Sequence, residues 1–204
     1  MNKMIKILVT GSIGAGKSTA CRLFGELGVP VFYSDTQAAK LMNWDLKLAQ
    51  KIKDTFGEHL YENSKLNRKA LGEIVFNNKE KLDTLNSIVH PAVIEVFEDW
   101  CETQERLFKD SEYVIEESAI GIETNMQERF DYVIVVTADE DVRIERTMKR
   151  DNCNEDSVRS RMNNQMSDAE KIKYADYVIV NNDFPNLECQ VKSIHSNILA
   201  AIKK

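Results

Sequence analysis

A glycine-rich segment near the start of the chain constrains the fold more than any other feature. Residues 11–18 read Gly-Ser-Ile-Gly-Ala-Gly-Lys-Ser and match the pattern G-x-x-x-x-G-K-[ST] without exception. The apolar run 5–10 before them is typical of a buried strand, and the pattern 17–27 is typical of a helix. In this arrangement the glycines allow positive φ, and backbone N–H groups at the helix N-terminus bind phosphate oxygens. The segment therefore predicts a phosphate-binding loop.

The same loop supplies two side chains with defined chemistry. Lys17 would reach the β- and γ-phosphates of a nucleotide, and the Ser18 hydroxyl would hold Mg²⁺. A phosphate loop identifies a nucleotide site but leaves the reaction open. The residues expected to bind the nucleotide are Gly11, Ser12, Ile13, Gly14, Ala15, Gly16, Lys17, Ser18 and Thr19.

Short apolar runs alternate with longer helical patterns along the chain. After the first strand, the runs 29–33, 113–115, 131–137 and 177–180 predict further strands. Because these runs are continuously apolar, they indicate a parallel sheet covered by helices on both faces. The predicted fold is α/β, with a doubly wound parallel sheet of about five strands.

One long region breaks this alternation. Residues 36–110 carry helical patterns and no convincing strand. His90-Pro91 interrupts them, and Pro91 suits the first position of a new helix, because its missing N–H would be unpaired there anyway. We therefore predict a nucleotide-binding core formed by residues 1–35 and 111–204, with residues 36–110 as a helical insertion.

Composition limits the location and the partners. The 204 residues include 27 Lys+Arg and 33 Asp+Glu, which give a formal charge of −6 and argue against a dedicated nucleic-acid binder. No apolar run approaches the roughly 20 residues of a membrane span, so we expect a cytoplasmic protein without a membrane partner. Four dispersed cysteines and three histidines suggest neither a zinc site nor a disulfide framework.

Several carboxylates follow the predicted strands. Asp35 comes directly after the second strand, at the edge of a parallel sheet where ligands gather. There it could accept a proton from a substrate hydroxyl, or it could cap the helix that follows. Glu116, Glu117 and Glu123 surround the end of the third strand, where they could assist Mg²⁺ or a substrate group, or be ordinary surface residues.

Arginines are concentrated late in the chain. Five of the nine lie between positions 143 and 161, at Arg143, Arg146, Arg150, Arg159 and Arg161. The first three have helical spacing, so they predict one cationic helix face. Such a face can neutralise charge on a transferring phosphate, with Arg146 and Arg150 favoured, or it can be solvated and paired with nearby acidic residues. Trp44 and Trp100 are expected to fill the core or to line a substrate groove.

Taken together, these residues resemble the dephospho-CoA kinase family over nearly the whole chain. Beyond the loop, the resemblance rests on the order and spacing of the segments 66–71, 85–91, 146–151, 161–165 and 175–182. Asp35 matches the second Asp of the family's Asp-Ala-Asp, whereas Tyr33 replaces the first. At 119–123, Ala-Ile-Gly-Ile-Glu stands where the family has Pro-Leu-Leu-x-Glu.

The resemblance implies a P-loop kinase that transfers the γ-phosphoryl group of ATP to the ribose 3′-hydroxyl of dephospho-CoA, with Mg²⁺ as cofactor. It implies that Asp35 is the catalytic base. Lys17, Arg146 and Arg150 would stabilise charge, and Arg68, His90 and Glu123 would bind the acceptor. Residues 150–174 would form a helical lid that excludes water. The alternatives are another small-molecule or nucleoside monophosphate kinase and a non-catalytic nucleotide-binding module. A monomer or a weak homo-oligomer is expected.

Overall fold

The computed structural model describes residues 4–75, 78–107 and 112–203. The chain divides into two compact units, one formed by residues 1–33 and 104–204 and the other by residues 34–103. The predicted domain boundary at 110–111 lies outside the described residues.

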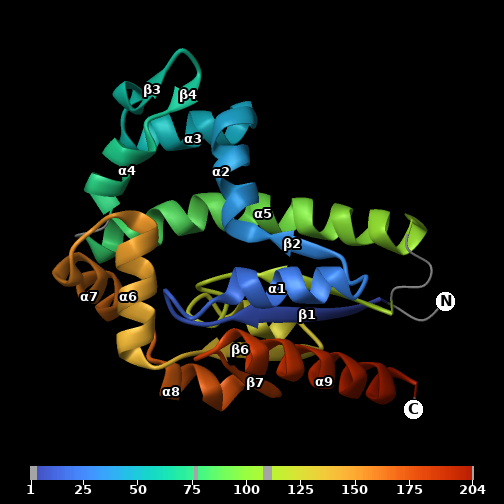
Figure 1. Cartoon of the computed structure of the whole chain (residues 1–204). Coiled ribbons are helices and arrows are strands. Elements are labelled where there is room, and N and C mark those ends of the chain that lie inside the picture. The colour runs from blue at the N-terminus through green and yellow to red at the C-terminus, as the bar shows by residue number, and fades with distance from the viewer. Residues whose placement is uncertain (1–3, 76–77, 108–111, 204) are drawn as a thin grey trace. The chain divides into compact units, whose positions relative to one another are not determined.

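The first unit is built on a five-stranded sheet (Figure 1). Its strands are β1 (Ile5–Thr10), β2 (Val31–Tyr33), β5 (Tyr113–Glu117), β6 (Tyr132–Thr137) and β7 (Tyr177–Val180). They lie in the order β2-β5-β1-β6-β7, and every neighbouring pair is parallel. The predicted doubly wound parallel sheet is therefore confirmed. Strand β5 extends beyond the predicted run 113–115, because Glu116 and Glu117 continue it as buried residues.

Helices flank this sheet. They are α1 (Lys17–Glu26), α6 (Glu140–Asp151), α7 (Glu155–Asn163), α8 (Asp168–Lys171) and α9 (Phe184–Ile202), with short 3₁₀ turns η2 (Met126–Arg129) and η3 (Ile172–Tyr174). Ile7 and Val9 of β1 face the apolar core that α1 and α9 complete, and both helices run along the sheet in Figure 1. Leu8 faces the opposite side, where it packs with Ile122. Successive residues of β1 thus bury both faces, which explains its continuous apolar run Ile7–Val9.

The second unit is mainly helical. Its elements are α2 (Ser34–Trp44), α3 (Leu46–Phe56), η1 (Glu58–Leu60), β3 (Tyr61–Glu62), β4 (Lys65–Leu66), α4 (Arg68–Val75) and the greater part of α5 (Lys79–Leu107). A small apolar core gathers Leu60, Leu66, Leu71 and Val75.

The expectation that residues 36–110 contain no strand was wrong. Strands β3 and β4 pair antiparallel in a hairpin, with Asn63 and Ser64 at positive φ in its two-residue turn. Two residues per strand are too few to produce a recognisable alternation of apolar and polar side chains. The asparagine in the turn was the only local signal, because asparagine tolerates the left-handed conformation.

The predicted helix interruption at His90-Pro91 was also wrong. Helix α5 runs unbroken for 29 residues with Pro91 inside it. Proline removes one backbone hydrogen bond from a helix interior. Buried Val89, Val93 and Phe97 follow one another at four-residue spacing, so packing holds the helix on both sides of the proline. Despite the length of α5, no helix in the described part of the chain is apolar enough to cross a membrane.

Candidate functional site

The glycine-rich loop joins β1 to α1 and approaches its neighbours closely. Gly11, Gly14 and Gly16 have φ values of 147°, 78° and 90°. A Cβ on Gly11 would lie 2.0 Å from the carbonyl oxygen of Val136, and one on Gly14 would lie 2.3 Å from that of Arg143. Glycine is therefore required at these positions both for backbone conformation and for space.

Lys17 lies folded over this loop. Its side chain is almost fully buried, and its Nζ donates a hydrogen bond of 3.3 Å to the carbonyl oxygen of Ser12. A bond of this length is weak, so a phosphate oxygen could replace it. Gly16 is the N-cap of α1 and provides no side-chain cap. The loop and the start of α1 together form an anion-binding site with a lysine beside it.

The carboxylate of Asp168, at the start of α8, connects three parts of the first unit. It accepts hydrogen bonds from the hydroxyl groups of Ser12 in the loop and Thr137 at the end of β6. Its Oδ2 also lies 3.6 Å from Nη1 of Arg143 on α6. The Asp168 and Arg143 side chains are only 16% and 11% exposed. Asp168 thus ties the loop to the helix that follows β6.

Two side-chain amides hold the loop backbone. Gln165 Oε1 accepts a hydrogen bond of 2.9 Å from the N–H of Ile13, and Asn181 Nδ2 donates one of 2.8 Å to the carbonyl oxygen of Ala15. Gln165 precedes α8, and Asn181 directly follows β7. The shape of the loop therefore depends on residues that lie 152 and 166 positions further along the chain.

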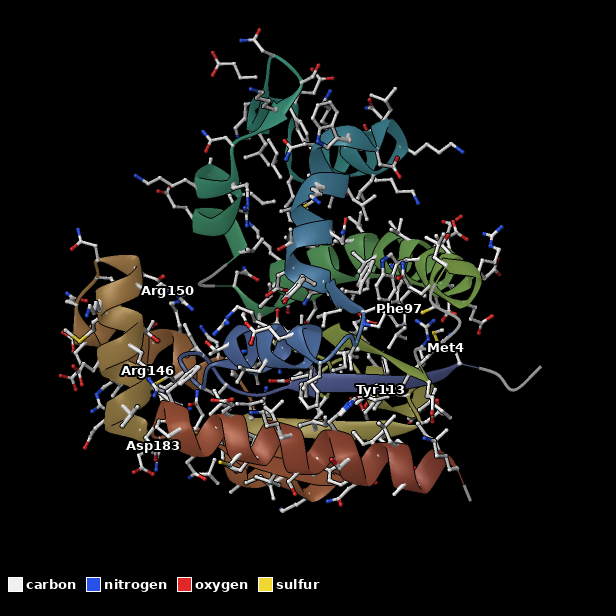
Figure 2. The ribbon with its side chains drawn as sticks, turned by 45° about the vertical axis from the view of Figure 1, so that its right-hand side comes forward. Met4, Phe97, Tyr113, Arg146, Arg150 and Asp183 are labelled. Atoms are coloured by element: carbon white, nitrogen blue, oxygen red, sulfur yellow. The ribbon has the colours of Figure 1, made fainter. Side chains whose placement is uncertain are left out.

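The arginines of α6 are held in place by specific contacts. Figure 2 labels Arg146 and Arg150, which lie about one turn apart on this helix. Arg146 donates to the carbonyl oxygens of Asn181 and Asn182, at 2.8 and 3.3 Å. Arg143 is buried beside Asp168, and its Nε has no hydrogen-bond partner. The predicted cationic face is thus partly occupied in supporting the loop.

Further along, arginines and acidic residues form ion pairs on the surface. Arg150 and Arg161 both bind the carboxylate of Asp151, with shortest distances of 2.7 and 2.6 Å. These hydrogen bonds lower the pKa of Asp151 far below its usual value. Arg159 binds Glu140 and Glu155. The pairing that sequence reasoning left as an alternative is therefore present, although exposed pairs exchange partners at little cost.

Glu117 lies where three strands end. It is buried, and it pairs in register with Val9 of β1 and with Tyr33 of β2. Burial raises the pKa of the Cys21 thiol, the Glu117 carboxylate raises it further, and the Lys17 ammonium lowers it. Glu117 and Lys17 therefore act on the same small region behind the phosphate loop.

The carboxylate of Glu123 is held by contacts with Lys171 and Met166. Its Oε1 lies 2.8 Å from Nζ of the fully buried Lys171 and accepts a hydrogen bond from the N–H of Met166. Its Oε2 is buried without a hydrogen-bond partner. A carboxylate held in this way has little freedom to move toward a ligand.

The second unit carries a pocket along one side of α2. This open pocket of about 410 Å³ is lined by Asp35, Lys40, Asn43 and Trp44 of α2, together with Arg68, the first residue of α4. A carboxylate, two cations, an amide and an indole therefore surround one volume. Such a set suits a ligand that carries hydroxyl, anionic and apolar groups.

Asp35 and His90 lie close enough to interact. Asp35 is exposed in the first turn of α2, which begins at Ser34, so Asp35 does not occupy the N-cap. Burial lowers the pKa of His90, and the Asp35 carboxylate partly offsets this effect. Asp35, Arg68 and His90 all belong to the second unit, whereas Lys17, Arg146, Arg150 and Glu123 belong to the first.

The described residues also bear on metal binding. Among them, no group of three or more His, Cys, Asp or Glu side chains could hold a metal ion. Mg²⁺ in phosphoryl-transfer sites usually uses one or two protein oxygens together with phosphate oxygens and water. The exposed hydroxyl of Ser18, directly after Lys17, fits that requirement.

Comparison with known proteins decides the family. Residues 5–186 match the family model described as dephospho-CoA kinase. The chain belongs to the dephospho-CoA kinase family. A dephospho-CoA kinase of Bacteroides fragilis (strain YCH46) is 35% identical over 178 residues, which cover 87% of this chain and 85% of the relative.

Solved structures agree with this family assignment. TT1252 from Thermus thermophilus has a TM-score of 0.82 and 29% identity, with coverage of 96% of this chain and 98% of that one. The dephospho-CoA kinase from Campylobacter jejuni has a TM-score of 0.62 and 27% identity, with the same coverage. The predicted resemblance is confirmed, and the chain is a kinase with a P-loop fold.

For this dephospho-CoA kinase family member, sequence reasoning missed Asp168 as a residue of the site. We expect Asp168→Ala to raise the KM for ATP about tenfold and to lower the free energy of unfolding by about 1–3 kcal/mol, because Ser12 and Thr137 lose their acceptor and Arg143 loses its counterion. Steady-state kinetics and urea unfolding measure the two effects.

Two further variants make this test specific. Asp168→Asn keeps an acceptor oxygen and should recover part of both losses, whereas Asp83→Ala removes an exposed carboxylate of α5 and should change neither. A loss of stability with an unchanged KM for ATP would mean that Asp168 supports the fold without positioning the loop.

Proposed function

We propose that this kinase transfers the γ-phosphoryl group of ATP to the ribose 3′-hydroxyl of dephospho-CoA, giving coenzyme A and ADP. The observation that carries the proposal is the family match over residues 5–186, within which the phosphate loop is complete. The acceptor in this proposal is the one in the family's own name.

In this proposal the first unit binds ATP through residues 11–19. Backbone N–H groups of the loop and of the first turn of α1 would hold the β- and γ-phosphates, while Lys17 exchanges its weak bond to Ser12 for a phosphate oxygen. Mg²⁺ bound with ATP, at the Ser18 hydroxyl, would neutralise phosphate charge. Glu117 is buried at the end of β5, in register with Val9 of β1, and would orient water around that site.

The second unit would bind the acceptor. The ribose 3′-oxygen would attack the γ-phosphorus while Asp35 accepts the hydroxyl proton. The bond between the γ-phosphorus and the bridging oxygen would break, and that oxygen would leave with ADP. Arg68 and His90 would orient the acceptor. Burial lowers the pKa of His90 and so favours its neutral imidazole, which would contribute hydrogen bonds rather than charge.

Charge that develops on the transferring group would be stabilised by Lys17, Arg146 and Arg150. Arg150 is exposed and its guanidinium pairs with Asp151 at the surface, so it can turn toward a phosphate at little cost. Residues 150–174 would act as the lid that excludes water. Within them Gln165 and Asp168 already bind the loop, so closure would chiefly move α7.

The test is an ADP-release assay with Mg-ATP, which compares dephospho-CoA, nucleoside monophosphates and no acceptor. We expect ADP release that depends on dephospho-CoA, with coenzyme A identified by mass. If only a nucleoside monophosphate supports release, the second unit binds a different acceptor. If ATP binds and no acceptor supports ADP release, the chain is a nucleotide-binding module, and the catalytic roles proposed for its residues are wrong.

A further inference from the structure

The indole of Trp44 is unusually exposed. Its residue is 82% exposed at the C-terminal end of α2, and it lines the pocket described above. A scattered exposed apolar residue is ordinary, but tryptophan on a pocket wall beside cationic side chains is typical of a ligand contact. The sequence alone left Trp44 as either a core residue or part of a substrate groove, and its exposure favours the groove.

The pocket residues of α2 follow one another in a defined order. Asp35 lies in the first turn, Lys40 near the middle and Trp44 at the last position of the helix. At 1.5 Å of rise per residue, Lys40 lies about 7.5 Å and Trp44 about 13.5 Å along the axis from Asp35. The helix thus presents a carboxylate, a cation and an indole in sequence, and Arg68 of α4 adds a second cation.

The proposed acceptor has its chemical groups in the same order. From the ribose 3′-oxygen, a covalent path of five and seven bonds leads to the two phosphorus atoms, and ten bonds lead to the branched carbon of the pantetheine arm. An extended chain advances about 1.2 Å per bond, so the phosphorus atoms lie about 6 and 8 Å away and the branched carbon about 12 Å away. These lengths match the separations of Lys40 and Trp44 from Asp35 along the axis of α2, when the 3′-hydroxyl lies at Asp35.

We propose that Trp44 packs against the branched apolar start of the pantetheine arm of dephospho-CoA, while Lys40 and Arg68 bind its diphosphate. This inference rests on the proposed function and assigns one wall of the pocket to a part of the acceptor that does not react. Trp44 would therefore determine specificity, because it favours acceptors that carry the arm over those that end at the diphosphate.

The adenine ring of the same acceptor fits the indole less well. Its centre is about six bonds from the 3′-oxygen, or about 7 Å, so adenine would reach the level of Lys40 and stop well short of Trp44. The two assignments differ in their consequences, since every adenosine acceptor carries the base and only dephospho-CoA carries the arm.

The experiment compares two acceptors in the full-length enzyme, dephospho-CoA and the β-methyl ester of ADP, which ends after the diphosphate. We expect Trp44→Ala to raise the KM for dephospho-CoA about tenfold, with kcat and the KM for ATP unchanged, and to leave the KM for the methyl ester unchanged. Trp44→Phe keeps an aromatic face and should recover most of the affinity. Because Trp44 is exposed, neither variant should disturb folding.

Two results would overturn the inference. An equal rise in KM for both acceptors would mean that Trp44 contacts the adenosine diphosphate part that they share. No change in KM for either acceptor would mean that Trp44 does not contact the acceptor.

Binding provides a readout that does not depend on turnover. The chain has two tryptophans, so in a Trp100→Phe background the fluorescence reports on Trp44 alone. Dephospho-CoA should quench this fluorescence at lower concentration than the methyl ester does, and equal titrations would contradict the arm assignment. If the wild-type enzyme turns over neither acceptor, the proposed function fails, and the titrations still decide whether Trp44 contacts the arm.

Discussion

Lys17→Ala should lower the turnover of dephospho-CoA by about 10³-fold, because in the proposed mechanism it removes a fixed positive charge beside the transferring phosphate. In the structure this ammonium group is almost fully buried and held at the loop by the carbonyl oxygen of Ser12. Burial thus keeps the ammonium group beside the loop before ATP arrives, and preorganised charge of this kind contributes most in the transition state. The measurement is kcat from ADP release at saturating Mg-ATP and dephospho-CoA.

A matched control separates this effect from a general loss of positive charge. Lys192→Ala also removes an ammonium group from the first unit, but that group is exposed and pairs with Glu188 one turn away on α9. We expect the control to retain wild-type turnover. If Lys17→Ala folds, as judged by its thermal unfolding, and still turns over at the wild-type rate, the assignment of the loop to phosphoryl transfer is wrong.

The second large effect concerns the proposed base. Asp35→Asn should lower kcat by about 10²-fold or more and leave the KM for ATP unchanged, because the amide keeps the shape of the side chain but cannot accept the 3′-hydroxyl proton. Since Asp35 is exposed in the first turn of α2, the substitution should cost little stability. Steady-state kinetics with each substrate varied in turn measure both quantities.

Asp54→Asn is the corresponding control, because it makes the same change at an exposed carboxylate of α3 in the same unit. It should leave kcat unchanged. An Asp35→Asn enzyme with normal kcat would remove Asp35 as the base. A raised KM for dephospho-CoA with normal kcat would instead give Asp35 a role in binding the acceptor alone.

The sheet and the phosphate loop could be predicted because their signals are local. Residues 7–9 are apolar on both faces of one strand, and the glycines of the loop match a pattern eight residues long. The hairpin β3–β4 and the helix through Pro91 could not be predicted, since the first is too short for periodicity and the second depends on packing that overrides a local preference.

The residues of the candidate site also divide into those that local sequence indicates and those that only the folded chain shows. Lys17 and Ser18 are defined by neighbours in the sequence, whereas Asp168 and Gln165 contact the loop across more than 150 residues, and no local pattern indicates such contacts. Trp44 was an apolar residue in a helical pattern, and only its exposure distinguishes it from a core residue. Long-range contacts and exposure are properties of the folded chain, so they become visible only with the structure.

The contacts of the phosphate loop also bear on the order in which the protein becomes functional during synthesis. The loop is synthesised before its supports, since β1 gains its sheet neighbours only with β5 and β6, and the loop gains its side-chain contacts only with Gln165, Asp168 and Asn181. A nascent chain that ends before these residues carries the complete glycine motif without the contacts that shape it. We therefore expect ATP binding to appear only after residues 165–181 have been synthesised, and a product that ends before them to bind ATP weakly.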